Sequence, residues 1–373
     1  MGAGLLAVAS MVVWAGVYHW QWSLALSRIS VLQWHAHEML YGYAMAVIAG
    51  FLLTAVRNWT SIDTAAGKPL MALFGLWLLP RLLFLGGDAW LLLAAIFDLV
   101  FTVALSFAVA RPIFQVRQWR QMAVLSKLIL LGGCNLLFYL AAFDVYAGGF
   151  SWGLYGGLYL VIGLILTMAR RVMPMFIQNG VDESVTLFNS RFLDLSSLVL
   201  FLAFFLSELV FDTPLASAWL ALGVFAVNVI RLLGWHNSGI WRKSLLWGLY
   251  LAYAFICLGF ALIASAYFFG VSKFIAIHAM SMGGIGMMTL AMMCRVAIGH
   301  TGRDLKAPPK GVAIGLALLL VGVVFRVVLP LLSPALYVQW LAISQLLWIL
   351  AFSVFVVTYW PILSRPRIDG RSG

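Results

Sequence analysis

The sequence predicts an all-α membrane protein, a polytopic bundle of about twelve transmembrane helices. Of its 373 residues, 64% are hydrophobic and only 9% are charged, whereas a soluble globular protein carries about 25% charged residues. No soluble core could hide this much apolar surface. We therefore expect a single integral membrane domain over residues 1–373, surrounded by the lipid bilayer.

Apolar runs of about 17–25 residues mark helices long enough to cross the hydrocarbon core of a bilayer. Twelve such runs occur, and no linker between them is long enough to separate domains. They fall near residues 2–18, 35–56, 69–86, 89–110, 123–142, 151–172, 192–211, 214–233, 244–265, 273–294, 311–333 and 336–360. The first run has no basic n-region and no clear cleavage site, so we interpret it as a helix rather than a signal peptide.

The basic residues predict which side of the membrane each loop faces. With the N-terminus placed in the cytoplasm, the inner loops and the C-terminal tail, which includes Arg371, contain all but four of the 23 lysines and arginines. Arg28 and Lys273 fall in outer loops, and Arg81 and Arg326 fall inside spans. This positive-inside bias predicts that both termini are cytoplasmic. It also accounts for the net charge of +11 without a nucleic-acid partner, and we expect none.

The segment Trp-His-Ala-His-Glu-Met at residues 34–39 heads the second apolar run. Ionisable groups at the mouth of a membrane helix are costly, and they are functional candidates by default. Imidazole is also the usual protein ligand for haem iron and for copper. His35 and His37 project about 200° apart on a helix, so they are not expected to bind one metal together. The alternative for either ring is a hydrogen bond in the headgroup region.

Further polar groups are expected in the outer half of the membrane. They are Arg81 in the third run, Asp98 in the fourth, His278 in the tenth and Arg326 in the eleventh. Either arginine is a candidate to hold a haem propionate, because the guanidinium fork matches a carboxylate; an ion pair between Arg81 and Asp98 is the alternative. Glu38 and Asp98 are candidates to carry protons at a catalytic site.

A second group of candidates is expected at the inner face. His236 follows the eighth run and His300 follows the tenth. A helix would hold His278 and His300 about 30 Å apart, so two metal sites are needed if both are ligands; an ordinary loop residue is the alternative for His300. Tyr250, in the ninth run, is a candidate to bind a ligand or relay a proton, with simple packing as the alternative.

Three separated motifs resemble the NnrS family, bacterial membrane proteins of about twelve spans that contain haem and copper and are linked to nitric oxide and nitrosative stress. The first is the segment at 34–39, followed by Gly-Phe-Leu-Leu-Thr-Ala-Val at 50–56. The second is Arg-Val-Met-Pro-Met-Phe at 171–176, which closes the sixth run. The third extends from His278 to Arg303. The motifs occur in the family's order, and the resemblance covers most of the chain.

The resemblance implies a haem b with His37 and His278 as axial ligands. His35 is then an alternative axial ligand or a ligand of a second metal such as copper, and His236 and His300 are candidate metal ligands at the inner face. The family usually has histidines where this chain has Tyr139 and Tyr250. Each cluster therefore lacks one histidine, and a member with one haem and no copper fits this pattern as well.

The function implied by the resemblance is binding or turnover of nitric oxide in the bacterial inner membrane. If the protein is an enzyme, it is a haem-dependent oxidoreductase acting on nitric oxide, with an electron donor that no motif identifies. The alternative is a transporter or assembly factor for haem or metal. No inverted repeat, which many transporters contain, is visible in the chain.

Overall fold

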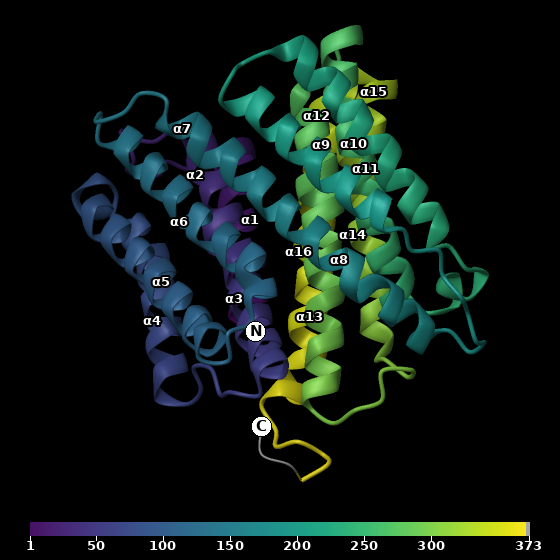
Figure 1. Ribbon diagram of the computed structural model, residues 1–373. Helices are drawn as coiled ribbons and strands as arrows, with labels where there is room; N and C mark the ends of the chain where they lie inside the picture. Colours follow the sequence, from purple (N-terminus) through teal and green to yellow (C-terminus); the bar gives the residue numbers. More distant parts are fainter. Residues whose placement is uncertain (371–373) are drawn as a thin grey trace. The chain divides into compact units, whose positions relative to one another are not determined.

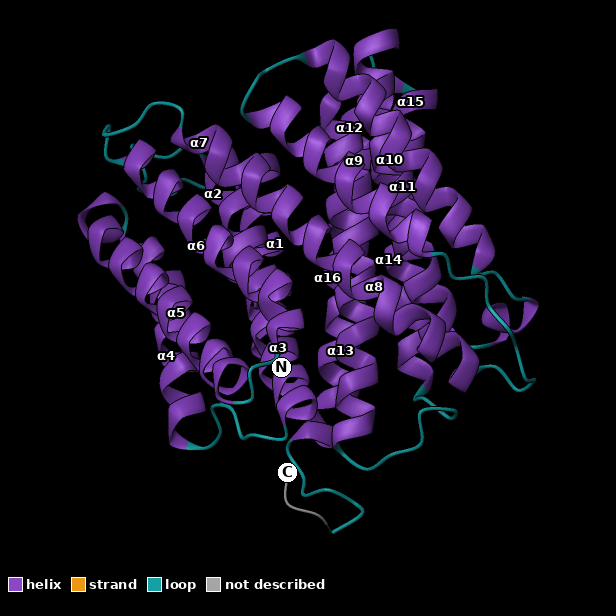
Figure 2. Cartoon of the chain, viewed as in Figure 1, coloured by secondary structure: helices purple, strands orange, loops and turns teal. Residues whose placement is uncertain are grey.

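The computed structural model describes residues 1–370, and all the regular elements among them are helices (Figures 1 and 2). Twelve helical stretches in this part of the chain are long and apolar enough to cross a membrane. The predicted all-α bundle of twelve spans is therefore confirmed. The side of the membrane on which the termini lie stays a prediction, and Arg371 of the C-terminal tail lies outside the described residues.

Most spans contain one long α-helix, and several contain shorter α, 3₁₀ or π segments as well. The first three are Gly2–Trp20 (α1), Val31–Thr60 (α2, Val31–His37; η1, Glu38–Ala44; α3, Met45–Thr60) and Lys68–Gly86 (α4, Lys68–Leu83; η2, Phe84–Gly86). The next three are Asp88–Gln115 (α5), Trp119–Ala142 (η3, Trp119–Gln121; α6, Met122–Ala142) and Gly149–Gly180 (α7, Gly149–Ser151; η4, Trp152–Gly156; α8, Gly157–Gly180). The seventh to ninth are Arg191–Leu209 (α9), Pro214–Gly234 (α10) and Ser244–Phe269 (α11). The last three are Lys273–His300 (α12, Lys273–His278; η6, Ala279–Gly286; α13, Met287–His300), Lys310–Leu332 (α14, Lys310–Val323; η7, Val324–Val328; α15, Leu329–Leu332) and Pro334–Leu363 (η8, Pro334–Leu336; α16, Tyr337–Leu363).

The second span begins at Val31 rather than near residue 35. Ser30 caps it: its hydroxyl accepts a hydrogen bond from the Gln33 backbone N–H at 3.2 Å, and its own backbone N–H donates to the Gln33 side chain at 2.7 Å. This reciprocal pair satisfies two of the free donors at a helix start. His35 and His37 therefore lie within a helix, not in front of one.

The sixth span also extends further than expected, because α8 continues past residue 172 to Gly180 and contains Pro174. A proline inside a helix removes one backbone hydrogen bond and strains the preceding turn. Here Met173 and Ile177 are both 1% exposed, so burial on either side of the proline helps to offset that cost. The motif at 171–176 lies inside a helix rather than at its end.

Four spans contain π-helical segments: η1 in the second span, η4 in the sixth, η6 in the tenth and η7 in the eleventh. Such wide turns are rare in proteins, and those that occur are often found at functional sites. Glu38 is the first residue of η1, His278 directly precedes η6, and Arg326 is in the middle of η7. Three of the candidate residues thus lie at these irregular turns.

The chain divides into two compact units. The N-terminal unit contains Gly2 and Val12–Leu164, and within it α4 packs on α5 and α5 packs on α6 (Figure 1). The C-terminal unit contains Met1, Ala3–Met11 and the chain from Ile165 onward, and within it α9 packs on α10, α10 on α11 and α14 on α16. Each unit holds one of the outer candidate histidine sites.

Candidate functional site

The N-terminal unit buries a cluster of ionisable and polar side chains around His37. The ring of His37 is 0% exposed, and Glu38 and Asp98 are 2% and 1% exposed. Arg81, near the end of α4, is 6% exposed and completes the charged set. The cluster is assembled from α2, η1, α4, α5 and α6, so its geometry depends on the packing of several helices.

Arg81 pairs with both carboxylates of this cluster. Its Nη2 lies 2.6 Å from Asp98 Oδ1, and its Nε lies 3.3 Å from Glu38 Oε2. Buried ionic groups are costly unless they are paired, and one guanidinium here serves two acidic side chains. The structure therefore shows the ion pair that was the alternative to a propionate-binding role for Arg81.

Two residues of α6 fix the orientation of Asp98. Asn135 and Tyr139 are four positions apart, so they share a face of the helix. The Asn135 amide Nδ2 donates to Asp98 Oδ2 at 2.9 Å, and the Tyr139 hydroxyl donates to the same oxygen at 3.1 Å. Tyr139 is thus a hydrogen-bond donor to a buried carboxylate.

Both ring nitrogens of His37 face oxygen atoms. Because the Asn135 amide nitrogen points at Asp98, its oxygen Oδ1 is the atom that lies 2.9 Å from His37 Nε2. Asp98 Oδ2 lies 3.5 Å from the same nitrogen, and Glu38 Oε1 lies 3.2 Å from Nδ1. An amide oxygen only accepts, so Nε2 carries a hydrogen here. A metal ligand needs a lone pair on the bonding nitrogen, and His37 Nε2 does not offer one in this arrangement.

His35 has a different neighbour from His37, as expected for residues two positions apart on a helix. Its ring is half-buried and stacks on Trp14 of α1, with centroids 4.5 Å apart and planes 8° from parallel. The two histidines of the 34–39 motif therefore serve different partners within the N-terminal unit.

The C-terminal unit holds the second outer site, formed by His278 and Arg326. His278 Nδ1 lies 2.7 Å from the backbone oxygen of Phe274, one helical turn earlier. A carbonyl oxygen only accepts, so Nδ1 carries the hydrogen. Nε2 lies 3.1 Å from Arg326 Nη2; because guanidinium nitrogens only donate, Nε2 is the acceptor and bears a lone pair.

The glycines after His278 are explained by close helix packing. A Cβ atom at Gly283 would lie 2.6 Å from the Phe255 side chain, and one at Gly284 would lie 2.5 Å from Ile256. Both neighbours belong to α11. At Gly286 a Cβ would lie 2.7 Å from Trp348 of α16. The small residues of η6 thus allow neighbouring helices of the C-terminal unit to approach closely.

Two of the candidates predicted for the inner face contact each other: the ring centroids of His236 and Tyr250 lie 5.9 Å apart, with the planes at 64°. His236 is exposed in the loop after α10, and its Nε2 accepts a hydrogen bond from Trp241 Nε1 at 3.2 Å. The Tyr250 hydroxyl donates to the backbone oxygen of Leu232 at 3.1 Å, as a packed tyrosine does. His300 is the exposed last residue of α13. Within residues 1–370, no group of three or more His, Cys, Asp or Glu side chains has the arrangement to hold a metal ion.

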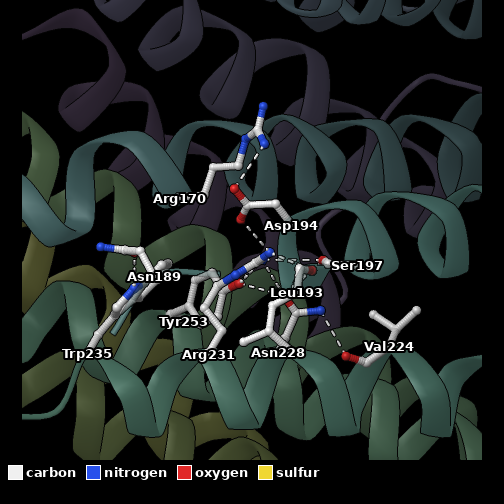
Figure 3. Close-up of polar contacts among 10 residues, drawn as sticks. All are labelled: Arg170, Asn189, Leu193, Asp194, Ser197, Val224, Asn228, Arg231, Trp235 and Tyr253. Carbon is white, nitrogen blue, oxygen red and sulfur yellow. Dashed lines mark hydrogen bonds and ion pairs between the residues drawn. The ribbon is translucent and has the colours of Figure 1, made fainter. Parts of the chain in front are cut away.

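Sequence reasoning missed a third polar cluster, centred on Arg231 of α10 (Figure 3). The positive-inside pattern counts Arg231 among the inner-loop residues, but the structure places it in α10 with its side chain 3% exposed. Its Nη1 donates to Asn228 Oδ1 at 2.8 Å and to the Tyr253 hydroxyl at 3.0 Å. The spacing of Asn228 and Arg231, three positions apart on one helix face, is the only signal for this cluster in the sequence.

Asp194 connects Arg231 to a second arginine. Its Oδ1 lies 2.9 Å from Arg231 Nη2, and its Oδ2 lies 3.3 Å from Arg170 Nη1 (Figure 3). Arg231 Nη2 also donates to the backbone oxygen of Leu193 at 3.0 Å. These contacts connect α8, α9 and α10, and the contact of Arg231 with Tyr253 connects α10 to α11. The cluster therefore links four helices of the C-terminal unit.

Comparison with known families places the whole chain in one of them. The family model described as NnrS protein matches residues 1–367. A comparison with curated proteins finds no match. Because the model covers nearly the full chain, the protein belongs to the NnrS family, as its three motifs predicted.

Proposed function

We propose that this member of the NnrS family is a haem protein of the bacterial inner membrane that binds nitric oxide. Family membership supports a membrane protein of the nitric oxide response, and the twelve apolar helices support a multi-pass location. The haem, the axial ligand and the choice of binding over turnover are parts of the proposal.

The observation that carries the proposal is the hydrogen bonding of His278. Metal-ligating histidines usually donate one ring N–H to a carbonyl or carboxylate, which fixes the tautomer and orients the lone pair of the other nitrogen. The Phe274 carbonyl does this for Nδ1, at 2.7 Å. His278 would hold haem iron through Nε2, and Arg326, whose Nη2 lies 3.1 Å from that atom, would be the candidate to hold a propionate. When bound, a haem would supply an iron atom that coordinates nitric oxide.

The remaining candidate ligands fit a metal less well. Both nitrogens of His37 face oxygens. His236 Nε2 is an acceptor like that of His278, but His236 lies exposed in the loop after α10. No cluster of three ligands exists in the part of the chain that the structure describes, so no copper site enters the proposal. Glu38 and Asp98, expected to carry protons, are both paired with Arg81. We therefore propose binding and assign no catalytic step.

An optical spectrum of the detergent-purified protein tests the proposal. It is recorded as isolated, after reduction, and after reduction with nitric oxide, with metal analysis on the same sample. We expect one haem per chain and a Soret band that shifts with nitric oxide. A colourless preparation from haem-replete cells, or a Soret band that nitric oxide leaves unchanged, would refute it.

The second candidate function is transport or assembly of haem or metal, and the buried cluster at His37 favours it. Paired charges inside membrane helices often mark the path of an ion or proton. This function predicts a loosely held cargo that washes out with a chelator or with apo-myoglobin. Haem that stays bound through the same wash favours the first candidate.

A further inference from the structure

We propose that Arg326 is a latch on the coordinating atom of His278, competing with a metal for the Nε2 lone pair. The proposal rests on the proposed haem site, and it adds a positioning residue to it. In the structure, Arg326 Nη2 lies 3.1 Å from Nε2. That distance is within hydrogen-bond range, and it places the guanidinium at the nitrogen through which His278 would hold a metal.

The atoms around the His278 ring determine which of its nitrogens donates a hydrogen bond and which accepts one. The Phe274 carbonyl takes the Nδ1 hydrogen of His278 at 2.7 Å, so Nε2 is the atom that faces the guanidinium. If the His278 ring were doubly protonated, it would be a cation facing the Arg326 cation, and Nε2–H would face a guanidinium that can only donate. The neutral ring with an acceptor at Nε2 is therefore the form that the geometry supports.

Arg326 is buried, and it lies in an irregular turn of its helix. It is 6% exposed, and its guanidinium carbon lies 5.6 Å from the centre of the Tyr337 ring. It belongs to the π segment η7, and His278 directly precedes the π segment η6. A π turn differs from an α turn by one inserted residue. Loss of that insertion rotates the side chains that follow or precede it, which gives Arg326 a route away from Nε2.

In this arrangement Arg326 controls access to His278 Nε2. An electrophile or metal reaches Nε2 only when the guanidinium has moved, and the displaced guanidinium is then available to an anionic group of the ligand, such as a propionate. Arg326 thus sets the rate at which the site is loaded. It does not touch the reacting atoms of nitric oxide, and we do not call it catalytic.

The first experiment measures access without haem. Diethyl pyrocarbonate modifies an imidazole nitrogen that bears a lone pair, and peptide mass spectrometry gives the rate for His278 alone. We expect Arg326→Gln to raise this rate about tenfold, the change that loss of one charge-assisted hydrogen bond allows, and Arg326→Lys to raise it less. Arg295→Gln is the matched control, because Arg295 stacks on Phe176 at 3.8 Å in the same unit. An equal rate in wild type and Arg326→Gln would overturn the latch.

The second experiment measures loading with haem itself. Protein from haem-depleted cells is mixed with hemin, and Soret absorbance follows uptake in wild type, Arg326→Gln and Arg326→Lys, each checked for an intact melting transition. Faster uptake by Arg326→Gln supports the latch, and equal uptake by coloured proteins contradicts it. If wild type takes up no haem, the proposed function fails, and the carbethoxylation rates still decide the latch.

Discussion

His37 and His278 are the same side chain in two opposite hydrogen-bond environments. His37, in the N-terminal unit, has an amide oxygen and a carboxylate oxygen against its two nitrogens. His278, in the C-terminal unit, has a carbonyl oxygen on one nitrogen and a guanidinium on the other. His37 Nε2 therefore carries a hydrogen, whereas His278 Nε2 is an acceptor with a lone pair. The comparison teaches that the partner atoms of a histidine, and not its place near the mouth of a span, decide whether it fits a metal.

The two environments also differ in how they are built. The partner of His278 Nδ1 is a backbone oxygen one turn earlier on the same helix, so that half of the site follows from local geometry. The main partners of His37 Nε2 come from α5 and α6. The His37 cluster therefore depends on helix packing and contributes to it, whereas His278 is oriented largely by its own helix.

The largest effect is expected from breaking the His37 cluster at its only guanidinium. Arg81→Leu would leave Glu38 and Asp98 buried without their main cation, a change that costs about 3–5 kcal/mol of stability. Thermal or denaturant unfolding in detergent measures it. The control is Arg57→Leu, since Arg57 is 59% exposed and pairs with the exposed Asp63; it should cost less than about 1 kcal/mol. Similar losses from the two variants would contradict a structural cluster at His37.

The Arg231 cluster provides a second test of whether buried, mutually paired polar groups stabilise the fold. Arg231→Leu removes five polar contacts and should cost about 3 kcal/mol, at the lower end for a buried pair, because Asp194 is partly exposed. Arg170 binds the same carboxylate, but its side chain is 37% exposed. Arg170→Ala should therefore cost less than about 1 kcal/mol. Unfolding curves of the two variants give the comparison, and equal costs would show that burial does not set the strength here.

Tyr139 and Tyr250, the positions where the sequence resemblance predicts histidines, give a smaller contrast in the strength of a single hydrogen bond. The Tyr139 hydroxyl donates to the Asp98 carboxylate, and the Tyr250 hydroxyl donates to a backbone carbonyl. Hydrogen bonds to charged groups are about twice as strong as neutral ones. We expect Tyr139→Phe to cost about 2 kcal/mol and Tyr250→Phe about 1 kcal/mol. The reverse order in unfolding measurements would mean that Tyr139 does not support the His37 cluster as described.

The spans were predictable because their signal is composition over about twenty residues, which needs no tertiary information. Pairing between Arg81 and Asp98 was predictable as an alternative, since two opposite charges in adjacent spans have few other partners. The roles of Asn135 and Tyr139 were not, because the apolar pattern of α6 does not reveal which face meets Asp98. Arg231 was missed because an arginine near the end of a span resembles a positive-inside anchor until its burial is known. The hydrogen-bond partners of His37 depend on several helices at once, and no local pattern specifies them.

The measurement that tests the account most directly is the haem content of two matched variants, His278→Gln and His37→Gln, purified in parallel with wild type. Their absorption spectra are normalised to protein, and their melting transitions show that each is folded. The account predicts that His278→Gln loses most of the haem or shifts its Soret band, and that folded His37→Gln keeps the wild-type spectrum. A folded His278→Gln with unchanged haem and spectrum, together with loss of haem from His37→Gln, would contradict it.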